Sequence, residues 1–217
     1  MNLDSKYRIL CYGDSNTWGT DPQKNSRRFG LQTRWAGILQ QELGSEFDVL
    51  EDGIPGRTLL TYEAEPNQLV TKSGLATFLN SVYAQLPLDL IVIALGVNDL
   101  RTHRTASMME LWKGYFKYGL LLNELVQSIG FSLPEIVYLF PVKPIEALQN
   151  YTWKGCEMKI DQLRQILHSS SSEVQGRFLD LNDVIKVSQY DGLHFDTETH
   201  TIIGEQLAVH LSKKMQK

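Results

Sequence analysis

The sequence is poor in cysteine, in long apolar runs and in clustered positive charge, and each shortage excludes a class of protein. Cys11 and Cys156 are its two cysteines, too few for a disulfide framework and not spaced as a C-x-x-C pair. No apolar run approaches the ~18 residues of a membrane span, and charged residues near the N-terminus interrupt any apolar core of a signal peptide. We therefore expect a cytoplasmic protein that does not enter a membrane.

An excess of one charge sign is also lacking. The chain has 21 basic and 25 acidic residues, a net charge of -4, and its Lys and Arg residues are not clustered densely enough to follow a phosphate backbone. Nucleic acid is therefore not an expected partner. A chain of 217 residues is long enough to bury roughly 70% of its unfolded surface, so we expect one domain over residues 1–217.

The alternation of segment types predicts the fold class. Apolar runs rich in β-branched and aromatic residues alternate with longer segments of helical period, which is typical of a parallel sheet with helices on both faces. Five strands are predicted, over Tyr7–Tyr12, Phe47–Glu51, Leu90–Leu95, Glu135–Phe140 and Arg177–Leu181. Five helices are predicted, over Thr33–Leu43, Gly74–Gln85, Ser107–Ser128, Lys154–His168 and Thr197–Lys213. The expected architecture is α/β, in three layers around a five-stranded parallel sheet.

Four short motifs follow predicted strands. They are Gly13-Asp14-Ser15, Gly56, Asn98 and Asp191-Gly192-Leu193-His194. Because open α/β sheets bind ligands beyond the carboxyl ends of their strands, we expect these motifs to meet there. Each alone has a plainer explanation as a polar turn, a turn glycine or a structural histidine. Together they supply every group that an acyl-transfer site needs.

Ser15 is the predicted nucleophile, because Gly13 lets the chain turn tightly off the first strand and a helix is expected to follow. A serine hydroxyl needs a neighbouring base near neutral pH, and the base needs a third group to hold its tautomer. His194 and Asp191, three residues apart, fit these two roles. The remaining histidines lie in helices or in an Arg-rich loop, where packing or solvation is the better explanation: His103, His168, His200 and His210.

Donors to a developing oxyanion are the next requirement, each worth ~2.7 to 4 kcal/mol. The predicted donors are the backbone amides of Ser15 and Gly56 and the side-chain amide of Asn98. Asp14 and Asp99 are expected to be structural carboxylates that bind loop amides. They are therefore not expected to take part in the chemistry.

The four motifs resemble the sequence blocks of the SGNH hydrolases, the GDSL-type esterases, whose name-giving residues correspond to Ser15, Gly56, Asn98 and His194. The resemblance extends over nearly the whole chain, although the first block reads Gly-Asp-Ser-Asn and not Gly-Asp-Ser-Leu. Further segments resemble the small arylesterase and acyltransferase branch of that family: Arg34-Trp35, Gly37-Ile38-Leu39, Glu51-Asp52-Gly53 and Gly56-Arg57-Thr58.

This resemblance implies a flavodoxin-like α/β/α fold with no metal or organic cofactor. It also implies that Ser15 is acylated, that His194 acts first as base and then as acid, and that Asp191 orients the imidazole. Members of the branch commonly form homo-oligomers through loops beyond the sheet edge. Two long connections, Asp52–Ser73 and Pro141–Trp153, are the places where such contacts are expected.

The expected substrate is a small ester with a short acyl group. Trp18 lies three residues after Ser15, and Tyr151 and Trp153 lie in the second long connection, so these aromatic side chains are predicted to wall a narrow pocket. O-deacetylation of a carbohydrate or another metabolite uses the same machinery and remains open.

Two alternatives from other classes explain less of the sequence. A flavodoxin-like protein that binds a flavin phosphate at Ser15–Thr17 leaves Asn98, Asp191 and His194 without a role. A metallohydrolase would use carboxylates and an imidazole that lack the usual spacing of metal ligands, namely Asp14, Asp99, Asp191 and His194.

Overall fold

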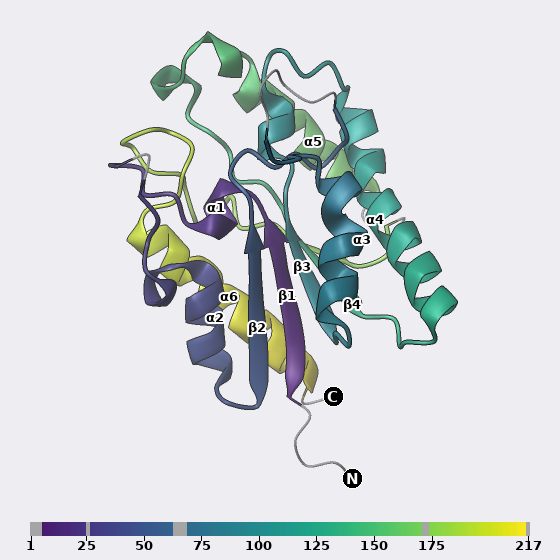
Figure 1. The fold of residues 1–217 in the computed structure, drawn as a ribbon. Helices are drawn as coiled ribbons and strands as arrows, with labels where there is room; N and C mark the ends of the chain where they lie inside the picture. The colour runs from purple at the N-terminus through teal and green to yellow at the C-terminus, as the bar shows by residue number, and fades with distance from the viewer. Residues whose placement is uncertain (1–5, 25–26, 63–68, 171–173, 216–217) are drawn as a thin grey trace.

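A five-stranded parallel sheet forms the centre of the protein, seen here in a computed structural model (Figure 1). The structure describes residues 6–24, 27–62, 69–170 and 174–215; the first five residues, on which the expectation of no signal peptide partly rests, lie outside this description, as does part of the connection 52–73. The strand order is β2-β1-β3-β4-β5. The strands are β1 (Tyr7–Gly13), β2 (Phe47–Gly53), β3 (Leu90–Ala94), β4 (Glu135–Leu139) and β5 (Arg177–Leu179). The α/β class and the five parallel strands predicted from the sequence are confirmed.

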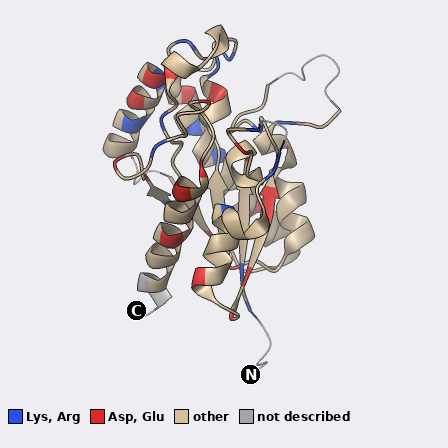
Figure 2. Cartoon of the chain, turned by 90° about the vertical axis from the view of Figure 1, so that its left-hand side faces the viewer, with Lys and Arg blue, Asp and Glu red and all other residues tan. Residues whose placement is uncertain are grey.

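Helices cover both faces of this sheet. One face carries α2 (Trp35–Leu43) and α6 (Thr197–Met215), which lie side by side in Figure 2, a view from their side of the molecule. The other face carries α3 (Gly74–Gln85), α4 (Met108–Ile129) and α5 (Cys156–Ser170). All five predicted helices are therefore present.

The start of α2 differs from the prediction. Arg34 has an extended backbone, with φ -77° and ψ 144°, so the helix begins at Trp35. Thr33 belongs instead to a separate 3-10 turn, Leu31–Thr33. No helix-breaking residue separates Thr33 from Trp35, so sequence periodicity alone does not locate this boundary.

Side chains alternate between the two faces of the sheet along each strand, and this alternation produces two hydrophobic cores. In β1, Ile9 and Cys11 pack toward α2 and α6, while Leu10 and Tyr12 pack toward α3 and α4. All four side chains are essentially inaccessible to water. Burial of each apolar side chain stabilises the fold by about 1.5–3 kcal/mol, and a one-residue slip would reverse every contact. The register of β1, and with it the position of the residues that follow, is therefore tightly fixed.

The carboxyl ends of the strands converge at one end of the molecule. The strand order reverses direction between β1 and β3, so the chain leaves these neighbouring strands toward opposite faces and a crevice forms beyond them. The start of β1 and the end of α6 lie at the opposite end, at the bottom of Figure 1. A ligand is thus expected next to the segments that follow β1 and β3.

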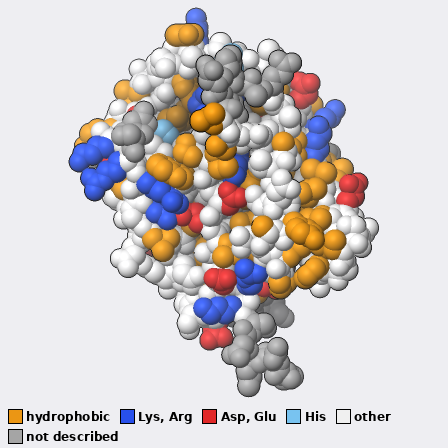
Figure 3. Space-filling view, viewed as in Figure 1, with side chains coloured by type: hydrophobic (Ala, Val, Ile, Leu, Met, Phe, Trp, Pro, Cys, Tyr) orange, Lys and Arg blue, Asp and Glu red, His pale blue; other side chains and the backbone are white. Residues whose placement is uncertain are grey.

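Charged side chains of both signs are scattered among apolar and polar ones on the face viewed in Figure 3. Within the described ranges, no helix is both long and apolar enough to cross a bilayer. Cys11 and Cys156 are free thiols in the interior.

Candidate active site

The turn after β1 places Ser15 at the carboxyl edge of the sheet. Asp14 caps the helix α1 (Ser15–Trp18), its Oδ1 accepting a hydrogen bond of 2.8 Å from the Asn16 amide. The turn requires a glycine at position 13, because a Cβ there would lie 1.9 Å from Oγ1 of Thr17. The expected helix does follow Ser15, but it is a single turn of four residues, so its dipole is much weaker than that of a longer helix.

Three predicted side chains meet in a continuous chain of contacts. Oγ of Ser15 lies 3.1 Å from Nε2 of His194, and Nδ1 of His194 lies 2.6 Å from Oδ2 of Asp191. Ser15 and His194 are separated by 179 residues in the sequence, so the fold alone brings them together. With 6% and 9% of their surfaces exposed, both are largely shielded from water, yet both line an open cleft.

The loop of Asp191 is built to hold its carboxylate against the imidazole. Oδ1 of Asp191 accepts hydrogen bonds from the amides of Leu193, at 3.0 Å, and His194, at 2.9 Å. Burial opposes ionisation of Asp191, but the hydrogen bonds from His194 and the two amides outweigh it, and its pKa lies below the ordinary value. Gly192 turns the chain with φ +66°, where a Cβ would meet the Ile145 carbonyl oxygen at 2.8 Å. Asp191 is therefore ionised and fixed at neutral pH.

Two residues that line the cleft have backbone amides available as donors. The N–H groups of Ser15 and Gly56 have no acceptor within the part of the chain that the structure describes, and both residues line the cleft. Gly56 has φ +81°, a conformation that residues with a Cβ rarely adopt. Backbone amides without an acceptor, on residues that line the same cleft as a serine hydroxyl, are the kind of donor that an oxyanion hole requires.

Asn98 lies beside these amides but is more engaged than the sequence suggested. Its Nδ2 donates to Oδ2 of Asp14 at 3.3 Å and to the Arg57 carbonyl oxygen at 3.1 Å, while its Oδ1 accepts from Arg101 at 3.2 Å. An oxyanion bound by this amide would therefore have to share a hydrogen with Asp14 or Arg57. Asp14 and Arg101 both contact this side chain, so the neutral amide lies between two charged groups.

Asp14 and Asp99 hold loop amides, as expected. Oδ2 and Oδ1 of Asp99 accept hydrogen bonds from the amides of Leu59, at 2.7 Å, and Leu60, at 3.0 Å. Burial raises the pKa of Asp99 to about 7 and that of Asp14 to about 6, against the opposing effect of these amide bonds. The role of Asp99 is to tie the segment after Gly56 to the end of β3.

Arg57 is a site residue whose role the sequence did not indicate. Its side chain is only 1% exposed, and its guanidinium donates to the carbonyls of Gly13 and Asp52 and to Oδ1 of Asp52. The same group stacks on the Tyr12 ring at 4.0 Å. Arg57 therefore joins the ends of β1 and β2 to the loop of Gly56.

Asn16 is a second residue that sequence reasoning missed. Its Nδ2 donates to the Leu193 carbonyl at 3.3 Å, and its Oδ1 accepts from the Phe195 amide at 3.1 Å. The side chain thus holds the backbone on both sides of His194 against the nucleophile turn. One feature of the sequence could have indicated this role: Asn16, with its polar amide, stands where the Gly-Asp-Ser-Leu motif has an apolar leucine.

The cleft above these groups has a volume of about 440 Å³ and is lined mostly by polar side chains. Trp18 and Trp153 line it, as predicted. Tyr151 is not among its lining residues and is 84% exposed, so its predicted position in the pocket is wrong. The physical reason is the 3-10 turn Tyr151–Trp153, in which successive side chains point about 120° apart, so Tyr151 faces solvent when Trp153 faces the cleft.

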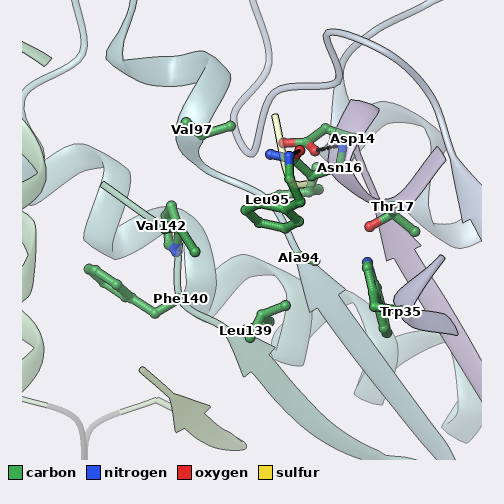
Figure 4. Close-up of a pocket in the computed structure, with 12 residues that line it drawn as sticks. Asp14, Asn16, Thr17, Trp35, Ala94, Leu95, Val97, Leu139, Phe140 and Val142 are labelled. Atoms are coloured by element: carbon green, nitrogen blue, oxygen red, sulfur yellow. Dashed lines mark hydrogen bonds between the residues drawn. The ribbon is translucent and has the colours of Figure 1, made fainter. Parts of the chain in front are cut away.

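A second, much smaller cavity lies beneath α1 (Figure 4). Its volume is about 20 Å³, and most of its lining is apolar, including Trp35, Leu139 and Phe140. This volume is large enough for a water molecule but not for an acyl chain. A substrate must therefore occupy the larger cleft.

The four residues considered as metal ligands do not form such a set. Asp14 binds an amide and Asn98, and Asp191 binds His194 and two amides. Over the described ranges, no group of three or more His, Cys, Asp or Glu side chains is arranged to hold a metal ion.

His200 has the packing role expected: it is fully buried beside Phe29 and Phe195, and burial lowers its pKa to about 3.

Comparisons with known proteins agree with this geometry. The model of the GDSL-like lipase/acylhydrolase family matches residues 11–217. The inhibitor-bound form of an aryl esterase from M. smegmatis is 26% identical, with a TM-score of 0.84, over 95% of this chain and 99% of that one. A carbohydrate acetylesterase from Sinorhizobium meliloti is 25% identical, with a TM-score of 0.85, over 96% and 99%. A search among curated proteins gives no match. The flavin-binding alternative receives no support from any of these findings.

Proposed function

The chain belongs to the GDSL-like lipase/acylhydrolase family, and on this premise we propose that it hydrolyses small carboxylic esters through an acyl-enzyme on Ser15. The observation that carries this proposal is the contact sequence Ser15 Oγ, His194 Nε2 and Nδ1, Asp191 Oδ2, with distances of 3.1 Å and 2.6 Å. Two unengaged backbone amides beside the hydroxyl support it. The fold is that of an ester hydrolase, as in the aryl esterase neighbour.

In the proposed first half-reaction, Oγ of Ser15 attacks the ester carbonyl carbon while Nε2 of His194 takes the hydroxyl proton. Asp191 holds the Nδ1 proton and stabilises the imidazolium. The carbonyl oxygen becomes negative and is bound by the amides of Ser15 and Gly56, with Asn98 as the third donor. When the tetrahedral intermediate collapses, the alcohol leaves with the proton from His194 and the acyl group remains on Ser15.

In the second half-reaction, a water molecule gives a proton to Nε2 of His194 and attacks the acyl carbon. The same oxyanion donors act again, and the proton returns to Oγ of Ser15 as the carboxylic acid leaves. An alcohol in place of water would give a new ester, so acyl transfer needs no further groups. We propose that both acceptors compete for the acyl-enzyme in the open cleft.

The proposed acyl group is short. Trp18 and Trp153 line the cleft together with Ser15, and the cavity beneath α1 is too small to extend it. O-deacetylation of a carbohydrate is the second candidate. The observation that favours it is the set of neutral polar side chains around the cleft, Thr20, Gln149 and Asn150, since such groups suit hydroxyl-rich alcohols. The carbohydrate acetylesterase neighbour is consistent with this candidate.

We also propose that the protein is a cytoplasmic homo-oligomer. The assembly is supported by large exposed apolar side chains in both long connections: Leu69 is 99% exposed and Tyr151 is 84% exposed. Sedimentation velocity tests the assembly, and a single monomeric species at micromolar concentration would contradict it.

The experiment for the esterase proposal is hydrolysis of p-nitrophenyl acetate combined with labelling by a fluorophosphonate. Ser15→Ala and His194→Ala should each remove nearly all turnover, and Ser15→Ala should abolish labelling. Ser128→Ala is the matched control, because Ser128 is an exposed serine on α4. Labelling of a peptide without Ser15, or full turnover by Ser15→Ala, would refute the assignment.

A further inference from the structure

A lysine side chain lies directly over the glycine of the oxyanion hole. If Gly56 carried a Cβ, that atom would lie 3.3 Å from Cδ, 3.6 Å from Cε and 3.4 Å from Nζ of Lys72. Lys72 also lines the cleft that contains Ser15. Its ammonium has no hydrogen-bonding or ion-pair partner within the described ranges. A positive charge is thus held beside the reacting centre.

The backbone fixes this position. Thr58 and Ser73 form an isolated parallel bridge, in which the Thr58 amide donates to the Lys72 carbonyl at 2.8 Å and the Gly74 amide donates to the Thr58 carbonyl at 2.9 Å. Lys72 is therefore attached to the same short segment that carries Gly56. Its stem lies along the glycine and covers the face that a larger residue would fill.

Among the described residues that line the cleft, basic side chains outnumber acidic ones. Lys72 and Arg101 are its cations, and Arg101 contacts Asn98 and stacks on Trp153 at 5.2 Å. Among the described residues that line this cleft, Asp191 is the one acidic residue, and its carboxylate is occupied by His194 and two amides. The unengaged amides of the oxyanion hole add their positive ends to the same space. A negative ligand group is therefore attracted, and a second cation is repelled.

We propose that the preferred ester carries an anionic group, such as a carboxylate, within a few atoms of the scissile carbonyl, and that Lys72 binds that group. This inference rests on the proposed esterase function and adds the charge class of its substrate. Lys72 acts here as a specificity-determining residue: it attracts the substrate without taking part in bond making or breaking.

Matched esters that differ only in charge test the inference on either side of the ester bond. On the acyl side, p-nitrophenyl hydrogen succinate is compared with its methyl ester; on the alcohol side, 4-acetoxybenzoate is compared with methyl 4-acetoxybenzoate. The measured quantity is the ratio of kcat/KM for the anionic ester to that for its neutral partner. Lys72→Met should lower this ratio on the order of tenfold in at least one pair, Lys72→Glu should lower it further, and Lys72→Arg should restore it.

Lys117→Met is the matched control, because Lys117 is exposed on α4, and it should leave the ratio unchanged. An unchanged ratio in Lys72→Met for both pairs would overturn the inference. So would an equal fall for the anionic and neutral esters, because Lys72 would then support the oxyanion and not the substrate's charge. If the wild-type protein hydrolysed none of the four esters, the esterase proposal itself would fail, which is a distinct result.

Discussion

The two hydrogen bonds by which Asn16 holds the backbone around His194, called here the Asn16 clamp, allow a quantitative prediction about catalysis. Asn16 is 8% exposed and holds the Leu193 carbonyl and the Phe195 amide, one on each side of His194. In Asn16→Leu, which keeps the branched shape and the number of heavy atoms of the side chain, both backbone groups lose their partner. Each unsatisfied buried group costs about 1–3 kcal/mol. We expect the free energy of unfolding to fall by about 2 kcal/mol or more.

The same change should slow the reaction. The loop of His194 would lose its contacts with the nucleophile turn and keep those made by Asp191 and by the Ser188 amide. A shift of Nε2 away from Ser15 weakens proton transfer in the transition state. If about 1.4 kcal/mol of the lost interaction appears in the barrier, kcat falls about tenfold. KM should change little, because Asn16 is not among the residues that line the substrate cleft. Steady-state kinetics on p-nitrophenyl acetate and urea unfolding measure the two effects.

Asn182→Leu separates loss of stability from loss of activity. Its amide forms a similar clamp away from the cleft, donating to the Pro141 carbonyl at 3.1 Å and accepting from the Lys143 amide at 2.8 Å. This variant should lose a comparable amount of stability, because the contacts of Asn182 resemble those of Asn16 in kind. Its kcat should stay within about twofold, because these contacts lie away from the cleft. If Asn16→Leu kept the wild-type kcat, or if both variants lost activity equally, the positioning role of Asn16 would be refuted.

Three further predictions concern the oxyanion hole, the buried acids and the cleft. Asn98→Ala should lower kcat for p-nitrophenyl acetate on the order of 100-fold or more, and a change below threefold would remove Asn98 from the hole. Burial raises the pKa of Asp99 to about 7 in the folded state from 3.8, so the folded state binds this proton more tightly and stability falls as pH rises from about 4 to about 7. Asp99→Asn should flatten this dependence by up to about 3 kcal/mol between pH 5 and pH 8 in urea unfolding; an equal change in both proteins would contradict it. Among p-nitrophenyl esters, acetate should turn over faster than octanoate, and the reverse order would exclude a cleft narrowed by Trp18 and Trp153.

Sequence patterns predicted the parts of the site that follow directly from strand ends. Ser15 follows β1 and Asn98 follows β3, and hydrophobic runs locate both strands to within one residue. Asp191 and His194 were recognisable because they lie three residues apart around a glycine. These features are local, so composition and spacing are sufficient to find them.

Other features depend on contacts that local sequence does not encode. The Asn16 clamp joins residues 177 and 179 positions apart, and Lys72 reaches Gly56 only because Thr58 pairs with Ser73. Likewise, the 3-10 turn that directs Trp153 inward and Tyr151 outward has no periodic signal over three residues. These placements are set by packing of distant segments, which explains why the sequence analysis missed or misplaced them.

The buried guanidinium of Arg57 separates two tasks within one site. This guanidinium links the turn after β1 and the end of β2 to the loop of Gly56. The backbone carbonyl of Arg57 also accepts a hydrogen bond from Asn98. The cleft walls, in contrast, are contributed by Trp18, Lys72 and Trp153, which do not touch that guanidinium. Substitution of the wall residues can therefore change which ester is preferred without disturbing the residues held by Arg57. This separation makes the protein a suitable starting scaffold for directed evolution toward new esters.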